Sequence, residues 1–321
     1  MYEGKEGMGK GKKIVLISGD EEYRSEEAMP MLGKILSVRH GFTCTVLFSM
    51  DAESKYIDPN NQQSLPGMKA LQDTDLIIVA TRFRTPPAEE MKWLEAYLDA
   101  GKPVIGLRTA THGFSGKWDY FGLQILGEKW VSHHGEHKRE GCRGVIESEN
   151  AEHPILTSVK DVFGPADVYT VANLPDDATI LLRGIVTKSL DPSSKALEGS
   201  KNNPKMPLAW LHHYTSPGGQ TGIAFCTTMG AAVDFVSEDL RRLIVNASYH
   251  LTGLKIPKKA NVNHVDPFTP SFYGFWGNQE VWAKRNLQVS DFAIGKAITP
   301  MDPPGSPEWP FRIIDNPNTT D

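Results

Sequence analysis

The sequence contains no apolar run that approaches the ~18 residues of a membrane helix. Its opening stretch, MYEGKEGMGKGKK, also lacks the apolar core of a signal peptide. These two absences predict a soluble protein that is cytoplasmic as written. A polar leader rich in Gly and Lys is also what remains after a signal peptide has been removed, so an exported, periplasmic protein stays open as the alternative.

Cysteine and net charge are both scarce. Three cysteines, Cys44, Cys142 and Cys226, are too few for a disulfide framework, so we expect buried, unreactive thiols. The formal net charge of -5 gives no strong field that would attract nucleic acid or an anionic membrane. We therefore expect a small-molecule ligand and no nucleic-acid partner, while a homo-oligomer stays open.

Several catalytic motifs are also missing. The chain has no GxSxG and no cysteine in the turn GLRTATHG, which disfavours covalent acyl chemistry. The segment SGDEEY has one glycine where dinucleotide binding requires three, and there is no phosphate-binding P-loop. The sequence thus predicts no nucleotide cofactor.

The first half of the chain alternates between strand and helix patterns. Apolar runs predict strands, and apolar residues spaced three and four apart, or a start after Pro86-Pro87, predict helices. The expected strands are 13–18, 42–48, 75–80 and 103–107, and the expected helices are 26–39, a short one near 65–71, and 88–100. In the helix 26–39, Pro30 should lie near the first turn. Right-handed crossovers of this kind wind a parallel, flavodoxin-like sheet.

Short strand patterns dominate the second half. They cover 143–148, 167–172, 179–187, 207–215 and 221–228, separated by Pro, Gly and Asp, and they predict antiparallel additions to the same sheet. A capping signal at Ser237 opens a helix through Tyr249. The chain therefore divides into a polar leader (1–12), an α/β domain (13–255) and an extended tail rich in Pro and aromatic residues (256–321).

Charged loops follow the strands of the predicted parallel sheet. Ligands bind such sheets at the carboxyl ends of the strands, so topology brings these loops to one edge. Each side chain alone is more typical of a solvated surface, but several arginine-bearing loops at one edge suit carboxylates and sugar hydroxyls. The residues concerned are Glu21, Glu22, Arg24, Arg82, Arg84, Arg108 and His112.

The segment WVSHHGEH concentrates His133, His134 and His137 in one loop. Neutral imidazole both binds metals and titrates near pH 7, so zinc binding and acid-base chemistry are both open. The spacing lacks the HExxH pattern and any CxxC partner. Acid-base or substrate contact by His134 or His137, together with His112, is favoured over zinc binding through the three histidines.

The chain resembles the ThuA-like (trehalose-utilisation) family, a branch of the class I glutamine amidotransferase-like superfamily, and is most similar to its planctomycete-type members. The resemblance covers about 13–253 and is carried by SGDEEYRSEEAMP, TRFRTPP, KPVIGLRTATHGF, WVSHHGEH, TTMGAA and SEDLRRLIVNASYHLTG. It implies a flavodoxin-like core and a link to sugar or glycoside metabolism. Glutaminase activity is not implied, because Arg108 stands near the place of the superfamily's catalytic cysteine, while His112 is retained nearby.

These observations favour a protein that holds a sugar or keto-sugar in a polar cleft. Glu22, Arg24, Arg82, Arg108 and His133 are the expected substrate-binding residues, and His112, His134 and His137 the expected acid-base residues, for proton transfer beside a carbonyl. One alternative is a non-catalytic sugar-binding or scaffold protein that uses the aromatic tail. The other is a metal-dependent hydrolase that uses the histidine-rich loop.

Overall fold

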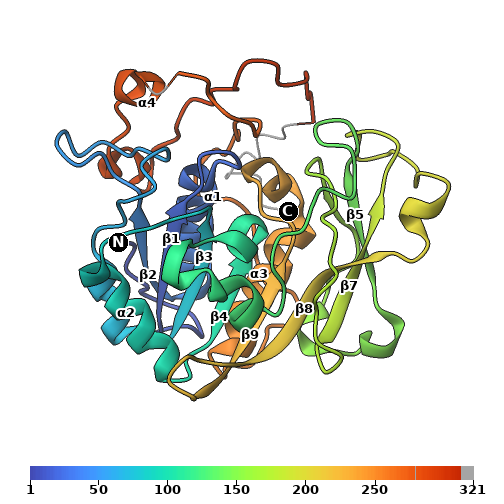
Figure 1. Cartoon of the computed structure of the whole chain (residues 1–321), viewed down its shortest axis with the longest axis horizontal. Coiled ribbons are helices and arrows are strands. Elements are labelled where there is room, and N and C mark those ends of the chain that lie inside the picture. Colours follow the sequence, from blue (N-terminus) through green and yellow to red (C-terminus); the bar gives the residue numbers. More distant parts are fainter. Residues whose placement is uncertain (279, 312–321) are drawn as a thin grey trace.

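Nine strands form one continuous sheet in the computed structural model, which describes residues 1–278 and 280–311. Their order across the sheet is β2-β1-β3-β4-β9-β8-β7-β5-β6. The strands are β1 (Lys13–Gly19), β2 (Thr43–Phe48), β3 (Leu76–Thr81), β4 (Val104–Leu107), β5 (Cys142–Ile146), β6 (Val162–Gly164), β7 (Thr179–Val186), β8 (Met206–Thr215) and β9 (Thr221–Thr227). Figure 1 shows them side by side through the middle of the molecule.

The strand directions change halfway across the sheet. β2, β1, β3, β4 and β9 are parallel to one another. β8, β7, β5 and β6 then each pair in the antiparallel sense with their neighbours. This arrangement confirms the predicted flavodoxin-like α/β class, with a parallel first half and antiparallel additions.

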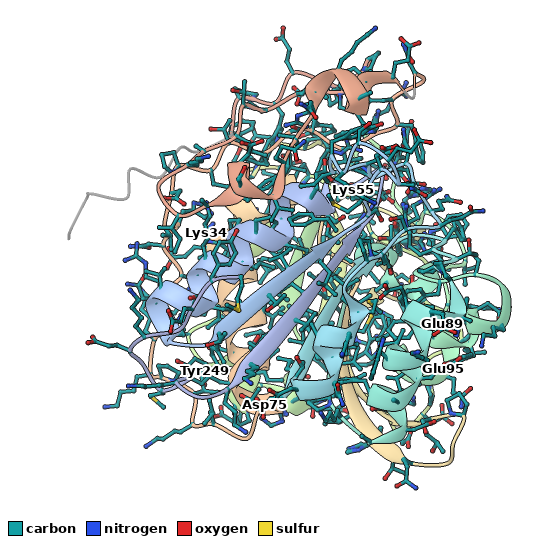
Figure 2. All side chains as sticks on the ribbon, turned by 90° about the vertical axis from the view of Figure 1, so that its left-hand side faces the viewer. Lys34, Lys55, Asp75, Glu89, Glu95 and Tyr249 are labelled. Carbon is teal, nitrogen blue, oxygen red and sulfur yellow. The ribbon has the colours of Figure 1, made fainter. Side chains whose placement is uncertain are left out.

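Helices cover both faces of the parallel half. α1 (Ser25–Lys34) and α3 (Glu238–Leu251) pack on one face, and α2 (Ala88–Asp99) packs on the other. The alternation of β1 explains this, because Ile14 and Leu16 belong to one core cluster and Val15 and Ile17 to the other. In Figure 2 the helix that carries Lys34 and the helix that carries Glu89 lie on opposite sides of the strands.

Three local predictions were wrong or incomplete. The segment 167–172 is not a strand: it makes one isolated bridge, between His133 and Tyr169, because its backbone pairs with the irregular loop 132–135 and not with a strand of the sheet. The short strand β6, which no pattern predicted, pairs with β5 instead. The helix expected at 26–39 ends as α1 at Lys34 and continues as a π-helix, with Pro30 inside α1 rather than in its first turn.

The N-terminal residues are attached to the sheet. The backbone of Tyr2 exchanges two hydrogen bonds with Cys44 at the outer strand β2, and its hydroxyl donates to the Phe292 carbonyl at 2.7 Å. All three cysteines are buried free thiols, as expected. Within residues 1–278 and 280–311, no helix has both the length and the apolar character needed to cross a membrane.

The C-terminal segment, residues 256–311, lies over α1 and includes the short helix α4 (Glu280–Arg285). Figure 1 shows its later part, which includes α4, in orange-red to red along the top of the molecule. Its main attachment is the buried carboxylate of Glu27, which accepts hydrogen bonds from the amide and hydroxyl of Ser271 at 2.7 and 2.6 Å. A second attachment is the ion pair between Lys34 and Asp266 at 2.5 Å.

We expect Glu27→Gln to destabilise the fold by about 2 kcal/mol. The amide of Gln is a neutral acceptor, and its NH₂ group would face the N–H or O–H of Ser271, which are themselves donors. Urea denaturation measures this, and limited proteolysis should show earlier cleavage after residue 256. Glu89→Gln, on the exposed face of α2, is the control and should leave the midpoint unchanged. Equal stability of the Glu27 variant and the wild type would contradict the attachment.

Candidate functional site

A pocket of about 110 Å³ opens where the loops after β1, β3 and β4 meet the histidine-rich loop. Glu22 and Arg82 supply its charged groups, and His112 and His133 supply imidazoles. Aromatic rings form much of the remaining wall, including Trp130 and Phe275. The prediction that loops at the carboxyl ends of the parallel strands converge is therefore confirmed for these positions.

The loop after β1 is fixed by Asp20. Its carboxylate accepts hydrogen bonds from the backbone amides of Glu22 and Tyr23, at 2.8 and 3.0 Å, and from the Thr109 hydroxyl at 2.6 Å. The last bond joins the loop after β1 to the turn after β4. Glu22 consequently stands at a defined place in the wall of the pocket.

Arg108 begins the turn after β4 with a positive φ of 42°, a conformation that is strained for a residue with a side chain. Its guanidinium lies between the rings of Tyr23 and Tyr169, 4.1 and 4.2 Å from their centroids. It donates to the Asp167 carboxylate and carbonyl, both at 3.0 Å, and to the Thr228 carbonyl at 2.9 Å. Because Arg108 is 1% exposed, the expected clamp on substrate is corrected to a buried support of the site.

Asp167 connects this buried arginine to two histidines. One carboxylate oxygen lies 2.7 Å from His133 Nδ1, and the other lies 3.1 Å from His137 Nδ1. Burial alone would raise the pKa of Asp167, but Arg108 and the two imidazole hydrogen bonds hold it below its usual range. An ionised Asp167 accepts from both Nδ1–H groups, which leaves both Nε2 atoms with free lone pairs.

Glu22 faces this pair of imidazoles. Its carboxylate lies 3.5 Å from His137 Nε2 and 3.4 Å from Arg82 Nε. Burial, followed by the nearby charge of Asp20, raises the pKa of Glu22 to about 7. The carboxyl group is thus poised between its neutral and ionised forms at neutral pH, as a general acid or base requires.

Arg82 is held between acids and aromatic rings. It forms an ion pair with Glu21 at 2.5 Å, and Glu21 also pairs with the buried Arg84. Its guanidinium lies 4.8 Å from the ring centroids of both Phe83 and Phe275. With a side chain 20% exposed in the pocket wall, Arg82 keeps its place among the candidate substrate-binding residues.

His112 lies in the pocket wall against aromatic neighbours. Its ring centroid is 4.8 Å from that of Phe83 and 5.4 Å from that of Trp130. Burial, with a further contribution from Arg82, lowers the pKa of His112 to about 3. The imidazole is therefore neutral at physiological pH and suited to hydrogen bonding more than to accepting a proton.

Two predicted site residues point elsewhere. His134 Nε2 lies 2.7 Å from the Lys201 carbonyl, because the backbone of His134 and Gly135 pairs with Val168 and turns the ring away from His133 and His137. Arg24 is fully buried, stacks on Trp282 at 4.9 Å, and donates to the Glu21 carbonyl. Neither residue lies in the pocket wall, so the acid-base role expected for His134 and the substrate role expected for Arg24 are corrected.

The only group in residues 1–278 and 280–311 with metal-ligand spacing is His133, His137 and Asp167, whose donor atoms lie within 4.8 Å of one another. Two imidazoles and a carboxylate suit zinc and other divalent transition metals. The zinc set expected from the sequence was His133, His134 and His137. In the structure Asp167 takes the place of His134.

Sequence reasoning missed Asp167, Tyr23 and Tyr169 as parts of the site. Asp167 had been placed in an expected strand, and it stands 30 residues or more from the histidines that it contacts. Phe275 comes from the tail, where its aromatic neighbours suggested docking but indicated no position. Only tertiary packing brings these residues together.

The fold and the pocket beyond the carboxyl ends of β1, β3 and β4 define a flavodoxin-like α/β protein with a polar, histidine-bearing site. The sequence model of the family described as ThuA, trehalose utilisation, matches residues 13–250, and the chain belongs to that family. No curated protein sequence matches it.

Two solved structures show the same fold. A ThuA-like protein from Parabacteroides merdae aligns with a TM-score of 0.52 and 16% identity over 77% of this chain and 92% of its own. A ThuA-like protein from Bacteroides uniformis aligns with a TM-score of 0.50 and 17% identity, over 78% and 95%. The residues beyond 250 lie outside the family match.

We expect Asp167→Asn to cost about 3–5 kcal/mol at pH 7, because it leaves the buried Arg108 without its counter-charge. The folded pKa of Asp167 is depressed, so its contribution is complete above the unfolded value of about 3.9 and fades as the pH falls. Urea denaturation between pH 7 and pH 3 should therefore show the gap between variant and wild type narrowing. Asp161→Asn, in an exposed ion pair with Arg143, is the control. A gap independent of pH would contradict this account.

Proposed function

We propose that the protein binds a sugar or keto-sugar in this pocket and transfers a proton beside the carbonyl group, with His133 and Glu22 as the reacting side chains. The observation that supports this most is the bridge from Asp167 to two imidazoles, which fixes both in the Nδ1–H form. It leaves His133 with an unprotonated Nε2 in the wall of the pocket that Glu22, whose pKa is raised to about 7, also lines.

The pocket wall suits a carbohydrate for two reasons. Glu22, Arg82 and His112 offer hydrogen-bond donors and acceptors in the pocket wall. Sugar hydroxyls can bond to both kinds of group, and a sugar carbonyl can accept from the donors. The rings of Trp130 and Phe275 offer faces on which the C–H surface of a pyranose can rest. Membership of a family described by trehalose utilisation agrees with such a ligand.

The proposed reaction moves one proton at a time. His133 Nε2 takes the proton from the carbon next to the carbonyl, and the C–H electron pair forms the enediol double bond. Protonated Glu22 gives its proton to the carbonyl oxygen, so charge does not accumulate. Reversal returns a proton from His133 to the same face of the carbon, and the carbonyl group forms again as Glu22 regains its proton. No covalent enzyme intermediate is needed.

In this scheme His137 acts on Glu22 and not on the substrate. It contacts Glu22 through Nε2 at 3.5 Å, and its ring packs 5.1 Å from that of Tyr273. Burial lowers the pKa of His137, against the opposing effect of Asp167, so the ring can accept the hydrogen of protonated Glu22. His137 would thereby hold the O–H group of Glu22 before the substrate binds, and the O–H group would turn to the carbonyl oxygen once the substrate is in place.

The test is deuterium exchange from D₂O into trehalose that has been oxidised to a ketone at one ring carbon. Wild-type protein should catalyse exchange at the carbon beside the ketone, and both His133→Ala and Glu22→Gln should slow it about 10²–10⁴-fold. His134→Ala is the matched histidine control and should retain full activity, because its ring binds the Lys201 carbonyl. Exchange no faster than in buffer would exclude the reaction.

A metal-dependent hydrolase is a second candidate, favoured by the spacing of His133, His137 and Asp167. These three residues would hold the ion, with Glu22 next to them. A bound zinc ion supplies an activated water and polarises a carbonyl. Glu22 would stand beside the ion as a hydrogen-bond and proton acceptor, because its carboxylate lies 3.5 Å from His137 Nε2.

Metal analysis of the freshly purified protein separates the two candidates. If this site holds zinc, we expect near-stoichiometric metal in the wild type, loss of it in the His133→Ala, His137→Ala double variant, and retention in His134→Ala. Metal that persists in the double variant would place the ion elsewhere. Wild-type protein that takes up no zinc when supplied with it would remove the hydrolase candidate.

A further inference from the structure

We propose that Phe275 and Trp130 form an aromatic platform at the rim of the pocket, which receives the second ring of a glycoside whose first ring occupies the pocket. This inference rests on the proposed sugar binding and adds the substrate class, a disaccharide or larger glycoside. Trp130 lies within the family match and Phe275 in the C-terminal segment beyond it, so that segment would supply one of the two rings.

Exposure distinguishes these two rings from the other aromatic residues around the site. Phe275 is 50% exposed and Trp130 is 36% exposed, whereas Tyr23 and Tyr169 are buried. Exposed aromatic faces beside charged groups have a cost in water that a stacked ligand would relieve. Both rings line the same pocket, so one ligand can contact them and Glu22 together.

Phe275 is held in place by its surroundings. The amide of Gly274 donates to the Glu22 carbonyl at 2.8 Å, and the φ of Gly274 is 142°, which favours glycine. Next to it, the Tyr273 hydroxyl donates to the Pro165 carbonyl at 3.1 Å, and the Phe275 ring lies 4.8 Å from the Arg82 guanidinium. A ring fixed in this way loses little entropy when a ligand stacks on it.

The size of the pocket argues for one ring inside it. The empty space of the pocket, its open mouth included, is about 370 Å³. At the roughly 30 Å³ that a water molecule takes up in the liquid, this space has room for about twelve waters, close to the roughly dozen heavy atoms of a hexose. A disaccharide has about twice as many atoms and would extend past the rim. There the two exposed rings offer it faces on which to stack.

The experiment compares the dissociation constants of two probes by calorimetry. The probes are trehalose oxidised to a ketone at one ring carbon, and glucose oxidised in the same way. For Phe275→Ala we expect about 3- to 10-fold weaker binding of the disaccharide, from a stacking energy of about 0.5–1.5 kcal/mol, and a clearly smaller loss for the monosaccharide, which reaches the ring only from inside the pocket. Phe275→Tyr should restore the wild-type value. Ile294→Ala, a tail residue that is 51% exposed, is the matched control.

The outcomes separate this inference from the proposed function. Three results would overturn the platform while sugar binding stands. Phe275→Ala could weaken the binding of both probes equally, it could weaken the binding of neither, or Ile294→Ala could have the same effect as Phe275→Ala. Failure of the wild type to bind either probe would overturn the proposed sugar binding, and the platform with it.

Discussion

The ion pair between Arg108 and Asp167 is the interaction on which the candidate site depends. It joins the turn after β4 to a segment 59 residues later in the chain, in a place where neither charge reaches water. A buried charge without its partner is costly, so each residue requires the other. The aromatic rings of Tyr23 and Tyr169 on either side of the guanidinium add further stabilisation and exclude water.

The consequences extend outward from this pair. Each oxygen of the Asp167 carboxylate lies next to the Nδ1 atom of one histidine. Asp167 therefore fixes the orientation of both His133 and His137 and holds both rings in the Nδ1–H tautomer. Glu22 lies on the other side of His137, next to its Nε2 atom. Burial and the nearby charge of Asp20 raise the pKa of Glu22. The buried Arg108–Asp167 pair thus fixes the positions of the polar groups that line the site. The strained turn at Arg108 is one place where the fold stores a local cost for that arrangement.

The C-terminal segment completes the site from outside the family's common region. It is attached to α1 through Glu27 and Lys34, and it places Tyr273 and Phe275 against His137 and Arg82. Relatives that share the α/β domain without such a segment would have a more open pocket.

The sequence by itself determined the α/β class, the parallel first half and the edge at which polar loops gather, because strand and helix periodicities and crossover handedness are local properties. It also named Glu22, Arg82, His112 and His133, which follow strands or lie in a dense histidine loop. Only the tertiary structure decided that Arg108 is buried, that His134 and Arg24 turn away, and that Asp167 holds the two imidazoles. The reason is physical: a side chain's direction and its partner depend on contacts between segments far apart in the chain, and no local pattern encodes them.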